Sequence, residues 1–350
     1  MSIVFSESLS KQQGSNNCAP IEILENDIIS ISPELLSVLL KDHTTQGNIF
    51  WATDDYADRG DGYLFGDPIT VESITGVNGN VIVPRSMKSR WRQQQRSREM
   101  AEVFTPSWIC NHQNNSIDAV WFGRDNVFNT EINNSDGTHS WIPTNGKIEF
   151  PNGKTWKDYV TENRLEITCG EAPYLVSRYD SVTGSPLPVE MRIGMLDRKL
   201  RIVGENTDTS GKWLAAARAA LRSTYGYEWQ GDNLVLARRN ILFTMLDYYR
   251  FKFDRNLPKQ SLKGLAYIIS WNIWQMDGIK GVIPCTCGER STTIHDLFGI
   301  TETVKQCDGC KTGNIREHNG KYALIVDWPN DITSSQVKHK KPIRFVDLLA

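Results

Sequence analysis

The sequence lacks any run of about 18 consecutive apolar residues, the length that a helix needs to cross a membrane. Its N-terminal segment also lacks the basic and apolar stretches of a secretory signal peptide. Positive charge is not in excess, because 39 Lys and Arg residues face 41 Asp and Glu residues, for a net charge of −2. We therefore expect a soluble, cytoplasmic protein without a membrane partner, in which any basic surface is local.

Three common catalytic motifs are also absent, namely His-Glu-x-x-His, Gly-x-x-x-x-Gly-Lys-Ser/Thr and Gly-x-Ser-x-Gly. Their absence excludes zinc proteases, P-loop NTPases and hydrolases of those types. Seven cysteines in 350 residues do not suggest a disulfide scaffold and instead indicate buried thiols or a metal site. With 39% hydrophobic and 23% charged residues, the composition is that of an ordinary globular protein.

The N-terminal region carries signals for short elements. Ser32 before Pro33 is typical of a helix start, so a short helix is expected from Pro33. Residues 50–84 are rich in Gly, Asp, Thr and Val, with turn signals at Gly60, Gly62 and Asn78-Gly79. This pattern predicts short strands or hairpins.

Strand and helix patterns alternate over residues 164–272. Apolar residues recur at helical spacing over residues 233–253, and Asp232 is the expected N-cap of that helix. Residues 213–224 are rich in alanine and are also expected to be helical, whereas residues 225–228 resemble the end of a buried strand. The alternation predicts an α/β fold with a mostly parallel sheet and flanking helices.

A local basic segment precedes this region. Residues 85–98 contain no acidic residue and six basic ones, which are Arg85, Lys88, Arg90, Arg92, Arg96 and Arg98. One interpretation is a solvated surface, and the other is an arm that contacts DNA phosphates and releases counterions.

Three further segments carry the most specific pattern. Residues 164–175, Arg-Leu-Glu-Ile-Thr-Cys-Gly-Glu-Ala-Pro-Tyr-Leu, predict a strand that ends at Glu166 and a tight turn at Gly170. Upstream, residues 102–106 are Glu-Val-Phe-Thr-Pro. Downstream, Gly-Tyr-Glu ends at Glu228 and precedes a helix that contains Ala-Arg-Arg-Asn-Ile-Leu.

Together, these segments resemble the cofactor motifs of adenine-specific DNA methyltransferases, the methylase subunits of restriction–modification systems, over residues 99–278. The resemblance implies a Rossmann-like core that transfers a methyl group from S-adenosylmethionine to adenine N6 in double-stranded DNA. Methylation of cytosine at N4 uses the same chemistry, so it remains an alternative reaction. A specificity or restriction subunit is a possible partner. The implied cofactor residues are Phe104, Thr105, Pro106, Glu166, Cys169, Gly170 and Glu228. Phe104 and Thr105 would line the methionine pocket, Glu228 would accept the ribose hydroxyls, and Cys169 would pack the loop.

The catalytic Asp/Asn-Pro-Pro-aromatic motif of that family has no counterpart, because no Pro-Pro dipeptide occurs. Asn272 with Trp274, at the end of an expected strand over residues 266–275, is one substitute for holding a flipped adenine. Asp327, before Trp-Pro, is another. The third alternative is a catalytically inactive, methyltransferase-like DNA-binding or assembly subunit. A further alternative is a metal-dependent nuclease, in which Asp197-x-Lys199 would lie on a strand of the catalytic core.

Four cysteines form two close pairs, Cys285-x-Cys287 and Cys307-x-x-Cys310. This spacing predicts a structural zinc site like that of a zinc ribbon, with His295 as an alternative ligand, although unligated thiols remain an alternative. The expected organisation is therefore an N-terminal region with the basic arm (1–98), a methyltransferase core (99–281), a zinc-ribbon-like insertion (282–322) and a C-terminal strand and tail (323–350).

Overall fold

The computed structural model describes residues 25–99, 102–103, 105–296, 299–329, 332 and 341–349. The α-helices are α1 (Glu25–Ile31), α2 (Pro33–Leu40), α3 (Arg90–Glu99), α4 (Ser107–Phe122), α5 (Trp156–Thr161), α6 (Met195–Asn206), α7 (Ser210–Arg222), α8 (Gly231–Phe253), α9 (Lys259–Asn272) and α10 (Asp308–Thr312). The strands are β1 (Asn129–Asn133), β2 (His139–Pro143), β3 (Arg164–Glu166), β4 (Thr224–Glu228), β5 (Ile273–Gln275), β6 (Arg290–Asp296), β7 (Gly299–Lys305), β8 (Leu324–Ile325) and β9 (Ile343–Arg344). Short 3₁₀ helices are η1 (Ala57–Arg59), η2 (Glu72–Ile74), η3 (Gly76–Asn78), η4 (Arg85–Met87), η5 (Val189–Met191) and η6 (Phe345–Leu348).

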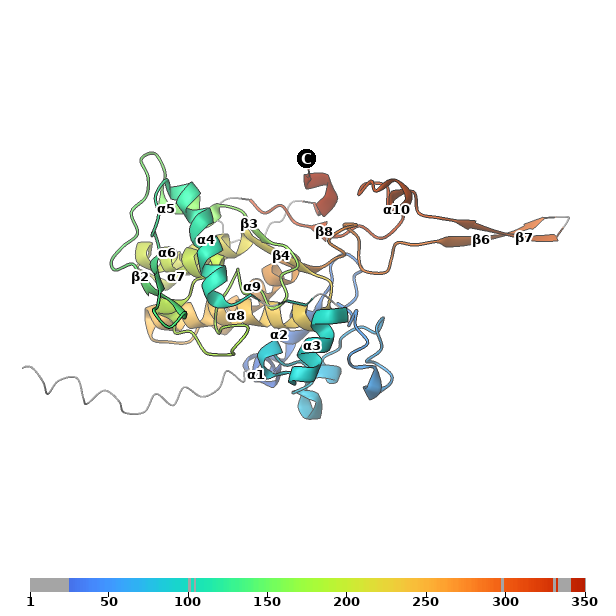
Figure 1. The fold of residues 1–350 in the computed structure, drawn as a ribbon, viewed down its shortest axis with the longest axis horizontal. Coiled ribbons are helices and arrows are strands. Elements are labelled where there is room, and N and C mark those ends of the chain that lie inside the picture. Colours follow the sequence, from blue (N-terminus) through green and yellow to red (C-terminus); the bar gives the residue numbers. More distant parts are fainter. Residues whose placement is uncertain are drawn as a thin grey trace, which may run out of the picture.

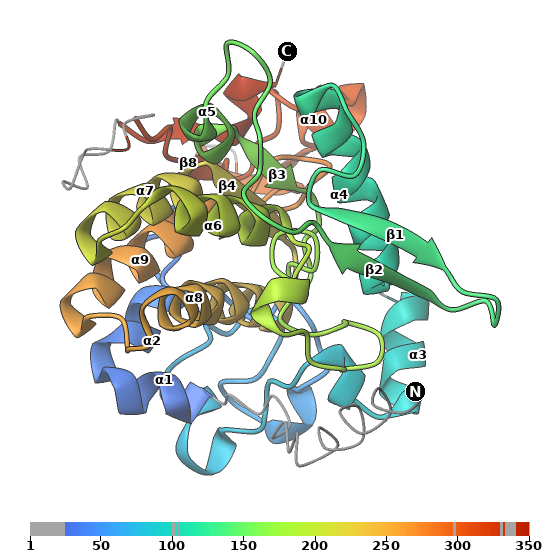
Figure 2. The same ribbon diagram turned by 90° about the vertical axis from the view of Figure 1, so that its left-hand side faces the viewer.

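A small parallel sheet organises the middle of the chain. Strands β3, β4 and β5 lie side by side in that order. Along the sequence, α6 and α7 connect β3 to β4, and α8 and α9 connect β4 to β5. Figure 2 shows α6 beside α7 and α8 beside α9. The predicted mixed α/β fold with a small parallel sheet and flanking helices is confirmed.

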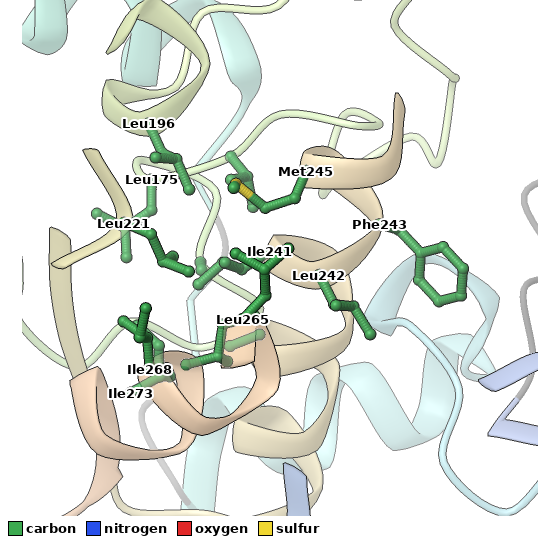
Figure 3. Close-up of a cluster of buried hydrophobic side chains, with 14 of the residues drawn as sticks. Leu175, Leu196, Leu221, Ile241, Leu242, Phe243, Met245, Leu265, Ile268 and Ile273 are labelled. Carbon is green, nitrogen blue, oxygen red and sulfur yellow. The ribbon is translucent and has the colours of Figure 1, made fainter. Parts of the chain in front are cut away.

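The hydrophobic core lies where these helices meet the sheet. Figure 3 shows Leu175, Leu196, Leu221, Ile241 and Leu265, which come from four helices and the loop after β3, packed around one centre. Helix α8 is buried along most of its length, so it is covered by neighbours on nearly every side. Such burial removes apolar surface from water and is the main stabilising contribution to the fold.

The helix predicted over residues 233–253 is present, but its start differs. Helix α8 begins at Gly231, and its N-cap is Gln230. Asp232 therefore lies inside the first turn, where its carboxylate forms ion pairs with Lys88 and Arg96 instead of capping the helix. The short helix predicted from Pro33 is confirmed as α2.

The short strands or hairpins predicted over residues 50–84 are present only in part. Phe50 and Pro68 form an isolated antiparallel bridge, whereas most of the segment forms turns and the helices η1, η2 and η3, because glycines with positive φ such as Gly60 and Gly62 turn the chain repeatedly. The strand predicted over residues 266–275 is wrong for most of its length. Residues 266–275 mostly belong to α9, and only the last three form β5. A short apolar run that is buried on all sides gives no periodicity that separates a helix from a strand.

Part of the C-terminal region projects from this core, whereas Val326 and Trp328 pack into it. Strands β6 and β7 pair as an antiparallel hairpin that projects from the rest of the molecule in Figure 1, next to α10. Strands β8 and β9 form a separate antiparallel pair. Within the described residues, no helix combines the length and apolar character that crossing a bilayer requires.

Candidate functional site

A cavity of 820 Å³ opens at the carboxyl ends of β3 and β4. Five of the seven residues expected to hold a cofactor line it, and these are Thr105, Glu166, Cys169, Gly170 and Glu228. Phe104 lies outside the described residues. Pro106 precedes the first residue of α4 and is absent from the described lining. The lining also includes Ala52 and Phe65, which lie far from these motifs in the sequence and which no motif indicated.

The loop after β3, residues 167–175, is held against the strands by backbone hydrogen bonds to carboxylates. Glu166 accepts from the backbone N–H groups of Tyr174 (3.3 Å) and Leu175 (3.1 Å). Gly170 has a φ of 52°, a conformation that glycine adopts without strain. On β4, a Cβ at Gly226 would lie 3.3 Å from Cys169, so glycine there allows the loop to pack closely.

Glu228, on the neighbouring strand β4, also holds this loop by a hydrogen bond. Its Oε2 accepts from the N–H of Gly170 at 2.8 Å, and its Oε1 accepts from the N–H of Gln230 at 3.1 Å. An ionised carboxylate has about four lone-pair sites, so these two bonds leave capacity for ligand hydroxyls. Glu228 is thus both a cavity residue and a structural support of the loop.

The cavity is acidic. Among its described lining residues, Glu99, Glu102, Glu166 and Glu228 carry carboxyl groups, whereas Arg98 is the only Lys or Arg. Burial raises the pKa of Glu166 well above its ordinary value, and the neighbouring Glu228 raises it further. Burial also raises the pKa of Glu228. A cationic ligand would relieve this repulsion, whereas an anionic one would add to it.

Cys169 has the packing role expected from the sequence. It is 2% exposed and contacts the core. Burial raises the pKa of its thiol, and the nearby carboxylates of Glu166 and Glu228 raise it further. The thiol therefore stays protonated and is a poor nucleophile.

Two of the six basic residues expected to contact DNA are instead buried in an ion-pair network. Arg96 pairs with Asp55, Glu102 and Asp232, and Lys88 lies 3.2 Å from Asp232. Burial opposes the ionisation of Asp232, but the two cations outweigh it and hold its pKa well below the usual range. Lys88 and Arg96 are removed from the candidate DNA contacts, because their charges are already paired inside the protein.

The other face of α3 forms an open groove. It is lined by Arg85, Arg90, Gln93, Gln94, Ser97 and Arg98 and has a volume of 400 Å³. Arg98 lines both this groove and the acidic cavity, so the two adjoin. Arg92 differs, because it donates to the backbone carbonyl of Asp55 and lies over the ring of Tyr56.

Asn272 cannot hold a flipped base in this structure, which corrects the first catalytic candidate. Its side chain is fully buried and donates to the carbonyls of Leu221, Arg222 and Thr224, each at 3.0 Å, while Trp328 donates to its Oδ1 at 2.6 Å. It precedes β5 and therefore lies at the amino ends of the parallel strands, opposite the edge that bears the cavity.

The other catalytic candidates also lie elsewhere. Trp274 is buried in a second core cluster with Tyr227 and Phe345. Asp327 is exposed after β8 and is not among the cavity's described lining residues. Glu166 and Glu228 lie at the carboxyl ends of β3 and β4 and line the cavity, whereas none of the catalytic candidates from the sequence is among the cavity's described lining residues.

The strand that the nuclease interpretation requires is absent, because Asp197 and Lys199 lie on helix α6. Both are buried and have internal partners. Asp197 accepts from Ser177 and from the N–H of Gly194, whereas Lys199 donates to Ser223 and to the carbonyl of Glu162. The two side chains therefore do not form a common metal site.

A second candidate site lies at the base of the projecting hairpin. Cys287, Cys307, Cys310 and His318 bring their ligand atoms within 4.8 Å of one another. From Sγ of Cys287, the distances are 3.3 Å to Cys307 Sγ, 3.5 Å to Cys310 Sγ and 3.4 Å to His318 Nδ1. This arrangement can hold one metal ion at its centre.

His318 takes the place that the sequence assigned to Cys285. Cys285 is exposed in a turn with a φ of 59°, outside the cluster. His295, the alternative ligand, belongs to β6 and pairs with Ile300. Gly309 explains how His318 reaches the cluster, because a Cβ there would lie 2.6 Å from the backbone nitrogen of His318.

In comparisons with known proteins, no family model, no curated protein and no solved structure matches this chain.

Proposed function

We propose that the chain is an S-adenosylmethionine-dependent DNA methyltransferase that acts on the exocyclic amine of adenine (N6). The observation that supports this most strongly is the acidic cavity. Three sequence segments that resemble cofactor motifs, and that are widely separated along the chain, contribute Thr105, Glu166, Gly170 and Glu228 to it. Ligands of open α/β sheets bind at this carboxyl edge of the strands.

The chemistry of the lining residues fits that cofactor. S-adenosylmethionine supplies an electrophilic methyl group on a positively charged sulfonium. Glu102 is already paired with Arg96, but the carboxyl groups of Glu99, Glu166 and Glu228 favour such a cation over phosphate-bearing nucleotides. Glu228 would accept the ribose hydroxyls, and the turn at Gly170 would let the backbone approach the ligand closely.

The groove beside the cavity supports DNA as the substrate. Arg85, Arg90 and Arg98 would contact phosphates, while the glutamines between them offer further hydrogen bonds. Because Arg98 also lines the cavity, a duplex in this groove would bring its bases near the cofactor. A restriction–modification role, with a specificity or restriction subunit as partner, is the setting that the resemblance implies.

The second candidate function is an inactive, cofactor-binding DNA module. It is favoured by the burial of Asn272 and Trp274, because the amide and aromatic pair that the sequence offered for catalysis does not line the cavity. For the Cys₃His cluster, we propose zinc with a structural role, since thiolates and imidazole in tetrahedral sites are typical zinc ligands.

Calorimetry with S-adenosylmethionine, followed by transfer of a radiolabelled methyl group to DNA, separates the functions. Binding with transfer supports the methyltransferase, and binding without transfer supports the inactive module. Absence of binding overturns both. Glu228→Gln disturbs the loop less than Glu228→Ala, because glutamine keeps the side-chain volume and one of the two acceptors that the N–H groups of Gly170 and Gln230 use, whereas alanine removes both. It should weaken cofactor binding about tenfold or more if a charged hydrogen bond to ribose is lost.

A further inference from the structure

A second cavity, the aromatic cavity, lies at the other end of helix α8. Its volume is 460 Å³, and it shares no described lining residue with the acidic cavity. Asn233 lines the acidic cavity and Tyr248 the aromatic one, which puts the two residues roughly 22 Å apart along the helix at 1.5 Å per residue. Pockets of about 300–1,000 Å³ hold small molecules in proteins, so this space is large enough for a ligand of its own.

Aromatic side chains form much of the wall. Phe128, Trp141, Trp213 and Tyr248 are buried, whereas Phe251 is 57% exposed and lies at the rim. Aromatic rings prefer to meet other rings in offset stacks or edge to face. A flat ring system is therefore the ligand body that this wall suits best.

Part of the lining is open to solvent. Val189 and Met191 of η5 and Gly204 of α6 are partly exposed. A Cβ at Gly204 would meet nothing within 4 Å in the described part of the chain beyond its own stretch of helix. A ligand can therefore reach this apolar wall from outside, and a side chain at position 204 would take up space that the ligand needs.

The charges at the aromatic cavity favour an anion. Four cationic and three acidic side chains line it, namely Arg192, Arg198, Arg201 and Lys252 against Glu190, Asp197 and Glu205. Burial raises the pKa of Asp197 and so opposes its negative charge. Asp247 compensates only part of the excess, because it pairs with both Arg178 and Arg192. Lys252 is exposed at the rim, where its ammonium group can meet an acidic group of a ligand.

We propose that the aromatic cavity is a second binding site, which takes a small aromatic compound that carries an acidic group. The rings of the ligand would lie against the aromatic wall, and its acidic group would lie near Lys252. The proposal is independent of the proposed function, because no described residue of the acidic cavity takes part in it.

Two dyes with the same rings test the preference for an acidic group. 8-Anilino-1-naphthalenesulfonate carries a sulfonate, whereas N-phenyl-1-naphthylamine is uncharged, and both become fluorescent in apolar surroundings. In fluorescence titrations, the full chain should bind about one sulfonate dye with saturation. Lys252→Gln should weaken this binding about twofold to fivefold, and Glu190→Gln should strengthen it by a similar factor, as expected for exposed charges. Binding of the uncharged dye should change less than about 1.5-fold in both variants.

A pair of glycine variants locates the bound dye. Gly204→Leu fills the aromatic cavity, and Gly264→Leu on α9 is the matched control, because a Cβ there also meets nothing within 4 Å and Gly264 is not among the described lining residues. Leucine is the better helix former, so both variants should fold. Gly204→Leu should weaken binding of both dyes about tenfold or more, and Gly264→Leu less than about twofold.

The possible results separate the two parts of the proposal. Absence of saturable dye binding by the wild type, or equal binding by the two glycine variants, overturns the site. Equal effects of Lys252→Gln and Glu190→Gln on the two dyes overturn the preference for an acidic group.

Discussion

Glu166 and Glu228 end neighbouring strands, and each carboxylate accepts two backbone N–H groups that shape the cavity wall. These bonds favour the ionised form, but burial acts more strongly in the opposite direction and raises the pKa of both groups. Without a cationic ligand, ionisation of the pair is therefore opposed by desolvation and by mutual repulsion. The residues that support the loop are also the residues that a cation would stabilise.

This burial predicts a pH dependence of stability. Because the folded-state pKa of Glu166 lies above its ordinary value of 4.5, its contribution is fully present below that pH and is lost as the pH rises through the raised pKa. The unliganded protein should lose free energy of unfolding as the pH rises from about 4.5 toward the raised pKa of Glu166. Glu166→Gln should reduce this slope in urea titrations, although Glu171 and Glu228 shift in the same direction and maintain part of it.

Exposed Glu72→Gln serves as the control for that measurement and should leave the slope unchanged. An unaltered slope in Glu166→Gln would show that the carboxyl group of Glu166 titrates normally in the folded state.

Asn272 should prove structural. Replacing it with alanine removes one acceptor and two donors that serve three carbonyls and the indole of Trp328. We expect the free energy of unfolding to fall by about 3 kcal/mol, while cofactor affinity is retained at temperatures where the variant is folded. Exposed Asn163→Ala is the control, with an expected change below about 0.5 kcal/mol. Loss of methyl transfer in a folded Asn272→Ala variant that still binds the cofactor would restore its catalytic assignment.

Among the elements, those with strong periodicity could be predicted from the sequence. The 3.6-residue pattern of α8 and the alternation that gives β3 and β4 are local signals. Burial on all sides hid the α9-to-β5 transition, because an apolar run such as residues 266–275 has no polar face. Contacts between residues far apart in the chain also leave no pattern in the local sequence. The spacing of Cys307 and Cys310 is visible in the sequence. The position of His318 beside them depends on the turn that the chain makes between Cys310 and His318, which the sequence does not reveal.

The metal cluster gives an element-scale prediction. A purified sample should contain about one zinc ion per chain, and His318→Ala should lower this content strongly. Cys285→Ser, which changes an exposed thiol outside the cluster, should keep the metal. Metal analysis by mass spectrometry checks all three samples. Full zinc content in His318→Ala, or loss in Cys285→Ser, would return the fourth ligand position to Cys285.

Helix α3 carries two kinds of arginine, which a pair of equal substitutions separates. Arg90→Gln on the groove face should weaken DNA binding and lower the salt-dependence slope by about one. Arg96→Gln should instead lower the free energy of unfolding by about 3–5 kcal/mol, because it removes the cation that pairs with the carboxylates of Asp55 and Glu102 and leaves Asp232 with Lys88 alone. Fluorescence anisotropy with labelled DNA and urea unfolding measure the two effects. Equal effects of both variants on DNA binding would contradict this division.

For the whole molecule, the cavity links regions that the sequence suggests are separate. Ala52 and Phe65 come from the N-terminal region, and most of the other lining residues come from the ends of β3 and β4 and the segments after them. The segment around the end of α3 contributes Arg98, Glu99, Glu102, Val103 and Thr105. The buried pairs between Arg96 or Lys88 and Asp232 join the same regions independently of any ligand. A ligand in the cavity would therefore stabilise contacts between distant parts of the chain.

Hydrogen exchange with saturating S-adenosylmethionine should detect this linkage. A ligand at 100 times its Kd adds about 2.7 kcal/mol to the stability of the folded state. We expect slower exchange around Phe65, around Thr105 and in the loops after β3 and β4, because all four segments line the cavity. The hairpin of β6 and β7 projects from the molecule and should exchange at an unchanged rate. Protection confined to the loops after β3 and β4 would mean that the N-terminal segment does not close over the ligand, and the cavity would then be a site of the α/β core alone.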